Sequence, residues 1–110
     1  MQLISRAQLQ AELAKGDVVV LEALPQNYYA DGHIPGAQNL PLDDIDSLAS
    51  DLIPTHATPV VTYCTGTSCP NSRIAAERLR ALGYTDVRAY EGGKEDWAKA
   101  GFPLETAVST

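Results

Sequence analysis

Two short runs of consecutive apolar and β-branched residues limit the possible folds of this chain more than any other feature. Residues 18–21 are Val-Val-Val-Leu, and residues 60–63 are Val-Val-Thr-Tyr. A strand with one wet face alternates apolar and polar residues, whereas a strand buried on both faces is apolar throughout. Both runs are therefore predicted to be central strands of a parallel sheet.

Helix and turn signals separate these runs. Ser5 is predicted to cap a helix over residues 6–15 that ends at Gly16. Apolar spacing predicts further helices within residues 42–53, after Pro70 up to Gly83, and over residues 94–100, with short strands at residues 3–4, 37–40 and 87–90 and a loop over residues 25–36. Alternating strands and helices predict an α/β fold, a parallel sheet with helices on both faces.

Length and charge narrow the class of protein further. The chain has 110 residues, which predicts a single domain over residues 1–110. Its formal net charge is −6, so neither nucleic acid nor an anionic membrane is an expected partner. The sequence contains no apolar run long enough to span a membrane and no signal-peptide pattern at its start, so we expect a cytoplasmic protein.

The two cysteines give the strongest indication of chemistry. Cys64 directly follows the second apolar run, at the carboxyl end of the predicted strand, where parallel sheets bind ligands. Cys69 lies five residues further on, so a bridge between them would close only a small loop and stabilise little. Neither His33 nor His56 has the spacing of a zinc ligand, and no metal is expected. Ordinary small residues in a loop remain the alternative interpretation.

The segment after Cys64 is predicted to bind an anion. It is short and rich in small polar residues: Thr65, Gly66, Thr67, Ser68 and Cys69. Backbone N–H groups of a loop that bends into a helix point inward, and the positive end of the helix dipole adds to them. The hydroxyl groups supply further donors, and the glycine permits a backbone conformation that other residues resist. We expect this surrounding to hold Cys64 as a nucleophilic thiolate.

Several motifs, in order along the chain, resemble the rhodanese-homology domain. They are Gly32-His33-Ile34-Pro35-Gly36-Ala37, Val61-Thr62-Tyr63-Cys64, Ala75-Ala76 with Leu79 and Gly83-Tyr84, and Gly92-Gly93 with Trp97 and Gly101-Phe102-Pro103. The resemblance spans nearly the whole chain and implies one rhodanese domain with a small five-stranded parallel sheet.

The resemblance also implies a sulfurtransferase. Cys64 would take sulfane sulfur from a small sulfur-containing substrate, thiosulfate or a persulfide, and become a persulfide itself. The loop N–H groups would stabilise the persulfide anion, and cyanide, a small thiol or a protein thiol would then remove the sulfur. This chemistry requires no cofactor.

Two departures from the family pattern bear on the substrate. Glu22-Ala23-Leu24 stands where many members have Asp-x-Arg, so the acid is kept and the Arg is missing. The loop after Cys64 is about two residues longer than in many members and contains no cation, and the nearest basic residue in sequence is Arg73 on the following helix. A loop without cations binds a dianion less well, which predicts weak thiosulfate:cyanide activity.

Three residues outside the loop are candidate supporting residues. Glu22 is expected to accept hydrogen bonds at the end of the sheet, with a general acid as the alternative. His33 is expected to anchor its own loop by bonding backbone, with a base near Cys64 as the alternative. Arg73 is the candidate cation closest to the loop.

Cys69 leaves a second function open. As a resolving thiol it would convert a persulfide or sulfenate on Cys64 into a Cys64–Cys69 disulfide, which describes a thiol redox or sensor domain. The alternative is an ordinary residue at a helix start before Pro70. A phosphatase or arsenate reductase is disfavoured, because position 70, six residues after Cys64, holds proline in place of arginine. A non-catalytic binding module is disfavoured by the retention of Cys64.

Overall fold

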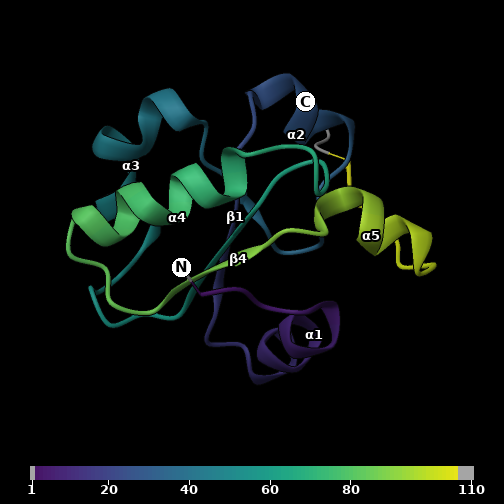
Figure 1. The fold of residues 1–110 in the computed structure, drawn as a ribbon, viewed down its shortest axis with the longest axis horizontal. Helices are drawn as coiled ribbons and strands as arrows, with labels where there is room; N and C mark the ends of the chain where they lie inside the picture. The colour runs from purple at the N-terminus through teal and green to yellow at the C-terminus, as the bar shows by residue number, and fades with distance from the viewer. Residues whose placement is uncertain (1, 107–110) are drawn as a thin grey trace.

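The computed structural model describes residues 2–106 and has a parallel sheet between two layers of helices (Figure 1). Residue 1 and residues 107–110 of the predicted single domain lie outside the described residues. The four strands are ordered β2-β1-β3-β4, with bounds β1 Val19–Glu22, β2 Gln38–Asn39, β3 Val60–Tyr63 and β4 Val87–Tyr90. The two apolar runs are the two central strands, as their composition predicts.

The helices are α1 Arg6–Lys15, α2 Gln26–Asp31, α3 Ile45–Leu52, α4 Asn71–Ala81 and α5 Gly93–Lys99, with a 3₁₀ turn η1 over Leu42–Asp44. Helix α1 begins and ends as predicted: Ser5 and Gln8 cap each other, and Gly16 adopts a φ of 80° after the last turn. Helix α2 lies in the segment predicted as loop. It buries none of its residues, so no apolar periodicity marks it in the sequence.

Each face of the sheet has its own apolar core. Helices α3 and α4 cover one face, and α1 and α5 cover the other. Successive residues of β3 alternate between the two cores, since Val60 packs toward α3 and α4 while Val61 and Tyr63 pack toward α1 and α5. This two-sided burial explains why the central strands have no polar face.

The predicted fifth strand is reduced to a single bridge, so the prediction of five strands is wrong by one. Leu3 bridges to Ala89 beside β4. The Ile4 N–H donates to the Ala89 carbonyl at 3.1 Å, and the Ala89 N–H donates to the Gln2 carbonyl at 3.0 Å. Ser5 caps α1, so the chain turns into the helix directly after Ile4.

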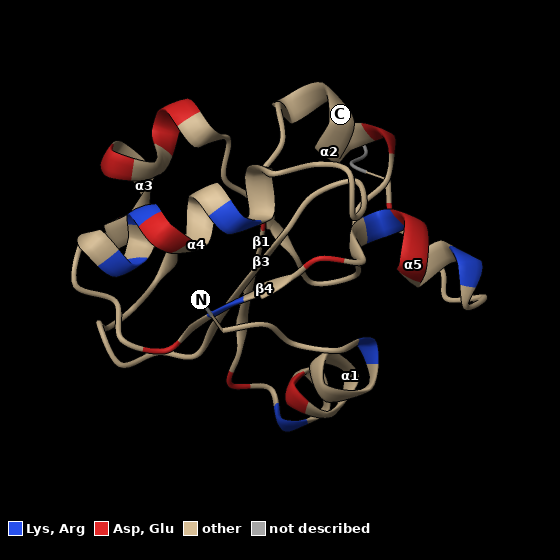
Figure 2. Cartoon of the chain, viewed as in Figure 1, with Lys and Arg blue, Asp and Glu red and all other residues tan. Residues whose placement is uncertain are grey.

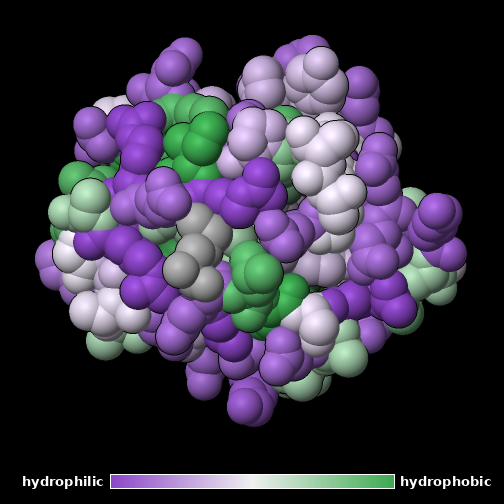
Figure 3. Space-filling view, in the orientation of Figure 1, coloured by the Kyte–Doolittle hydropathy of each residue, from purple (hydrophilic) through white to green (hydrophobic). Residues whose placement is uncertain are grey.

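Charge is unevenly spread over the described surface. Asp43, Asp44 and Asp46 lie at η1 and the start of α3, whereas the loop between β3 and α4 carries no charged side chain (Figure 2). The face shown in Figure 3 is mostly hydrophilic, with separate apolar patches. Within residues 2–106, no helix is both long and apolar enough to cross a membrane.

Candidate active site

The candidate site lies where β1 and β3 end. Glu22 and Tyr63 are register partners at the ends of these strands, and Cys64 follows Tyr63 directly. Cys64 has no exposed surface, whereas Cys69 is half-buried. The Cys69 N–H donates to the Gly66 carbonyl at 3.1 Å, which folds the loop back over Cys64 before α4 begins. Both predicted cysteines thus lie together at the carboxyl end of β3.

The first turn of α4 points its free N–H groups at the two sulfurs. The backbone of Asn71 lowers the pKa of Cys69, and the backbone of Ser72 lowers the pKa of Cys64. The Cys64 thiol in turn donates to the Cys69 carbonyl at 3.2 Å. Helix N-termini leave such donors unpaired and carry positive partial charge, so this end of α4 favours negative charge on sulfur.

The pKa of Cys64 is raised, although the prediction expected its thiolate to be favoured, and the pKa of Cys69 is lowered. Burial raises the pKa of Cys64, a hydrogen bond with Cys69 raises it further, and the Ser72 donors only partly offset this. Burial also raises the pKa of Cys69, but hydrogen bonds from Cys64, Asn71 and Thr65 together outweigh it and leave this pKa below its usual value. Of the two thiols, Cys69 is therefore the one that loses its proton more readily.

Ser72 is a site residue that the sequence reasoning missed. It is fully buried on the first turn of α4, and its Oγ has no hydrogen bond of good geometry within residues 2–106. Its hydroxyl faces the Cys64 sulfur and lowers the pKa of that thiol. Its carbonyl accepts the Thr62 hydroxyl at 2.7 Å, which ties α4 to β3. The sequence feature that could have indicated Ser72 is its place in the first helical turn after the cysteine loop.

A buried ion pair supports the strand ends. The Tyr63 hydroxyl donates to Glu22 Oε1 at 2.8 Å, and Lys94 Nζ of α5 lies 3.0 Å from Glu22 Oε2. Burial raises the pKa of Glu22, while Tyr63 and Lys94 act in the opposite direction. Lys94 also donates to the Tyr28 carbonyl at 2.7 Å. A cation distant in sequence thus pairs with the acid of the Glu22-Ala23-Leu24 segment.

The start of α5 holds the beginning of the cysteine loop. The Lys94 N–H donates to the Cys64 carbonyl at 3.0 Å, and the Glu95 N–H donates to the Thr65 carbonyl at 2.9 Å. Gly93 makes this approach possible, because a Cβ on it would overlap the Cys64 carbonyl oxygen and its φ is +59°. A Cβ on Gly66 would overlap the Glu95 carboxylate, so that acid lies directly over the loop.

The other predicted supporting residues lie in separate contacts. His33 Nδ1 bonds the Tyr29 carbonyl at 2.9 Å and its ring stacks on Tyr29 with centroids 3.8 Å apart, which makes it an anchor of its own loop. Arg73 forms an ion pair with Glu91 at 2.7 Å, so its positive charge is already paired. No group of three or more His, Cys, Asp or Glu side chains within residues 2–106 is arranged to hold a metal ion.

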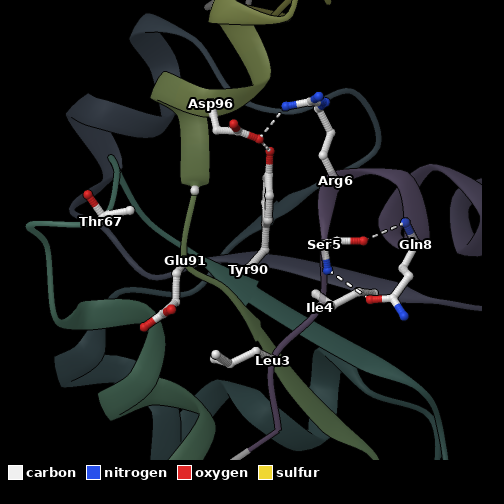
Figure 4. A pocket seen from close by; sticks show the side chains of 10 residues that line it. Leu3, Ile4, Ser5, Arg6, Gln8, Thr67, Tyr90, Glu91 and Asp96 are labelled. Carbon is white, nitrogen blue, oxygen red and sulfur yellow. Dashed lines mark hydrogen bonds and ion pairs between the residues drawn. The ribbon is translucent and has the colours of Figure 1, made fainter.

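An open groove of about 490 Å³ borders the loop at Thr67 (Figure 4). It lies between the start of α1 and the start of α5. Arg6 and Tyr90 both point at Asp96 across it, and the Arg6–Asp96 ion pair measures 2.8 Å. Leu3 adds an exposed apolar side chain to its wall. A small molecule in this groove would reach the loop from the solvent side.

The family model of the rhodanese-like domain matches residues 5–100. The chain belongs to the rhodanese-like domain family. Its relatives include an HTH-type transcriptional regulator of Mycobacterium tuberculosis, 31% identical over 93% of this chain and 44% of the regulator. They also include the thiosulfate sulfurtransferase GlpE of Ectopseudomonas mendocina, 39% identical over 94% of this chain and 90% of that enzyme.

A solved rhodanese-like structure agrees with the fold. The human single-domain sulfurtransferase superposes with a TM-score of 0.80 at 26% identity, covering 90% of this chain and 96% of that one. The chain spans less than half the length of the mycobacterial regulator. The same domain is therefore found alone in sulfurtransferases and joined to further sequence in a regulator.

Replacing Gly93 by Ala is expected to lower the free energy of unfolding by more than about 1 kcal/mol. The new Cβ meets the Cys64 carbonyl oxygen and also suffers the positive φ. Gly16→Ala is the matched control, because Gly16 has a φ of +80° but no atom within 4 Å of its Cβ position. Urea unfolding of both variants separates the cost of the overlap from the cost of the positive φ. Equal losses in the free energy of unfolding would show that the overlap is unimportant.

Replacing Lys94 by Met is expected to lower the free energy of unfolding at neutral pH by roughly 1.5–3 kcal/mol, the worth of a hydrogen bond to a charged group. The pKa of Glu22 lies above its ordinary value of 4.5, so ionising Glu22 as the pH rises already costs stability, and losing Lys94 increases this cost. The loss should therefore shrink at about pH 4. Lys99→Met, on the exposed side of α5, is the control. A loss that is the same at both pH values would contradict the pairing.

Proposed function

We propose that the chain is a sulfurtransferase in which Cys64 carries sulfane sulfur as a persulfide. The observation that supports this most is the position of the Cys64 sulfur, at the end of β3, beneath the N–H and the unpartnered hydroxyl of Ser72. These donors suit the negative charge on the terminal sulfur of a persulfide. Membership of the rhodanese-like family, and the sulfurtransferases among its relatives, support transfer of sulfur as the reaction.

The proposed reaction is two displacements at sulfur. A cysteine thiolate attacks the sulfane sulfur of the donor, and the bond from that sulfur to the rest of the donor breaks. The electron pair leaves with sulfite when the donor is thiosulfate, or with a thiolate when the donor is a persulfide. An acceptor (cyanide, a small thiol or a protein thiol) then attacks the terminal sulfur and restores the cysteine.

The electrostatics of the site favour a persulfide donor over thiosulfate. Arg73 is paired with Glu91, and Lys94 is paired with Glu22. The Glu95 carboxylate lies over Gly66 of the loop. A dianion such as thiosulfate therefore meets backbone and hydroxyl donors and a nearby negative charge, with no unpaired cation in the loop itself. We expect weak thiosulfate:cyanide activity for this reason.

The closeness of the two cysteines, in which the Cys64 thiol donates to the Cys69 carbonyl at 3.2 Å, favours a second candidate, a redox or sensor domain that cycles to a Cys64–Cys69 disulfide. The two functions differ in the thiols that they need. A disulfide cycle fails when Cys69 is replaced by Ser, whereas a persulfide on Cys64 can still form.

The test is the mass of the reduced chain after incubation with thiosulfate or with glutathione persulfide. We expect one added sulfur atom, removed by cyanide and located on Cys64 by peptide mapping. The variant with both Cys64→Ser and Cys69→Ser is the blank. A chain that gains no sulfur from either donor, and loses two hydrogens under mild oxidant, would replace the proposal with the redox function.

Replacing Ser72 by Ala is expected to slow cyanide-dependent sulfur release about 3- to 10-fold, because one hydrogen bond to the persulfide is lost. Stability should not fall, since the Ser72 hydroxyl has no partner of good geometry in the resting chain. Ser50→Ala, an exposed change on α3, is the control. Thiocyanate formation and thermal unfolding are measured together. A loss of stability, or an unchanged rate, would argue against this role.

A further inference from the structure

The proposed sulfur carrier is closed off from solution. Cys64 has no exposed surface, and its thiol donates to the Cys69 carbonyl at the far end of the loop, at 3.2 Å. Cys69 is the second thiol of the loop and is half-exposed at its far end. A donor that approaches the loop therefore meets the sulfur of Cys69 before that of Cys64.

The groups around Cys69 favour its ionised form, which is the form that attacks sulfur. The backbone of Asn71 and the backbone and hydroxyl of Thr65 lower the pKa of its thiol. Burial opposes ionisation at Cys69, but these groups and the Cys64 thiol outweigh it, so its pKa is lowered while that of Cys64 is raised. Cys69 is thus both the more exposed of the two cysteines and the one that loses its proton more readily.

We infer that Cys69 is the entry thiol of a two-cysteine relay: it takes sulfane sulfur from the donor and passes it to Cys64. The inference deepens the proposed function and rests on it. Cys64 stores the sulfur out of reach of water, and Cys69 exchanges it with molecules in solution. A persulfide is the favoured donor, for the electrostatic reasons given above.

The relay balances without an oxidant or a reductant. In the first step the Cys69 thiolate attacks the sulfane sulfur of the donor persulfide, and the donor thiolate leaves. In the second step the Cys64 sulfur attacks the outer sulfur on Cys69, and the bond from that sulfur to Cys69 Sγ breaks. The electron pair stays on Cys69, and the proton of the Cys64 thiol moves there, which leaves a Cys69 thiol and a Cys64 persulfide anion.

The position of the donors explains why sulfur comes to rest on Cys64. Ser72 offers this sulfur its N–H and a buried hydroxyl that has no other partner of good geometry. A persulfide anion on Cys64 satisfies that hydroxyl, whereas a thiol there leaves it without a strong acceptor. The second step in reverse returns the sulfur to Cys69 when an acceptor arrives.

The experiment follows sulfur loading from glutathione persulfide over time, by intact mass and peptide mapping, in three proteins. The unsubstituted chain is expected to gain one sulfur that maps to Cys64. Cys64→Ser should still gain one sulfur, on Cys69, at a rate close to that of the unsubstituted chain. Cys69→Ser should load Cys64 at least about 10-fold more slowly, since Cys64 is fully buried and its raised pKa leaves its thiol less ionised.

A matched control tests whether any exposed thiol would serve. Ser50→Cys in the background without Cys64 and Cys69 places one exposed cysteine on α3, away from the N-terminus of α4. It is expected to load at least about 10-fold more slowly than Cys69 does in Cys64→Ser. Equal rates would show that the loop gives Cys69 no advantage and would overturn the relay.

The outcomes separate the relay from the proposed function. If the unsubstituted chain gains no sulfur, the proposed function fails. If it gains sulfur on Cys64 and Cys69→Ser loads equally fast, the sulfurtransferase stands and the relay is wrong. If loading is followed by a disulfide and free sulfide, Cys69 attacks the inner sulfur and the relay is again wrong.

Limited alkylation with iodoacetamide keeps the inference testable even where a variant fails to fold. In the unsubstituted reduced chain, Cys69 is expected to be modified at least about 10-fold faster than Cys64. Faster modification of Cys64 would overturn the assignment of Cys69 as the entry thiol.

Discussion

The first turn of α5 packs against the backbone just after β3, and the rest of the site is built on this contact. Two of its N–H groups hold the carbonyls of Cys64 and Thr65, an approach that only glycine at position 93 allows. The next side chain along, Lys94, reaches the Glu22 carboxylate at the end of β1. One helical turn therefore sets the path of the cysteine loop and also neutralises a buried acid between the central strands.

The site stabilises negative charge with dipoles and not with free cations. Helix α4 supplies N–H groups to both sulfurs, and the basic side chains Arg73 and Lys94 are each paired with an acid. Dipoles held in place by the fold stabilise a single negative charge on sulfur at little cost in reorganisation. They compensate the charge of a dianion less well. A loop without cations therefore suits a persulfide donor better than thiosulfate.

Much of the fold follows from local sequence patterns. The central strands, α1 with its caps and the position of Cys64 after β3 all depend on residues close together in the chain. The missing fifth strand and the additional helix α2 do not follow in this way. At the first, the chain makes a single bridge to Ala89 and then enters α1 at the Ser5 cap; the second is a surface helix without a buried face.

The sequence by itself determined that a cysteine ends a buried parallel strand, that a short polar loop without charge follows it, and that a second cysteine lies within reach. Only the tertiary structure decided which thiol is the more acidic, that Ser72 faces Cys64, and that Lys94 pairs with Glu22. The physical reason is that pKa values and ion pairs depend on burial and on neighbours from other elements. Lys94 is 72 positions from Glu22 in the chain, and no local pattern joins them.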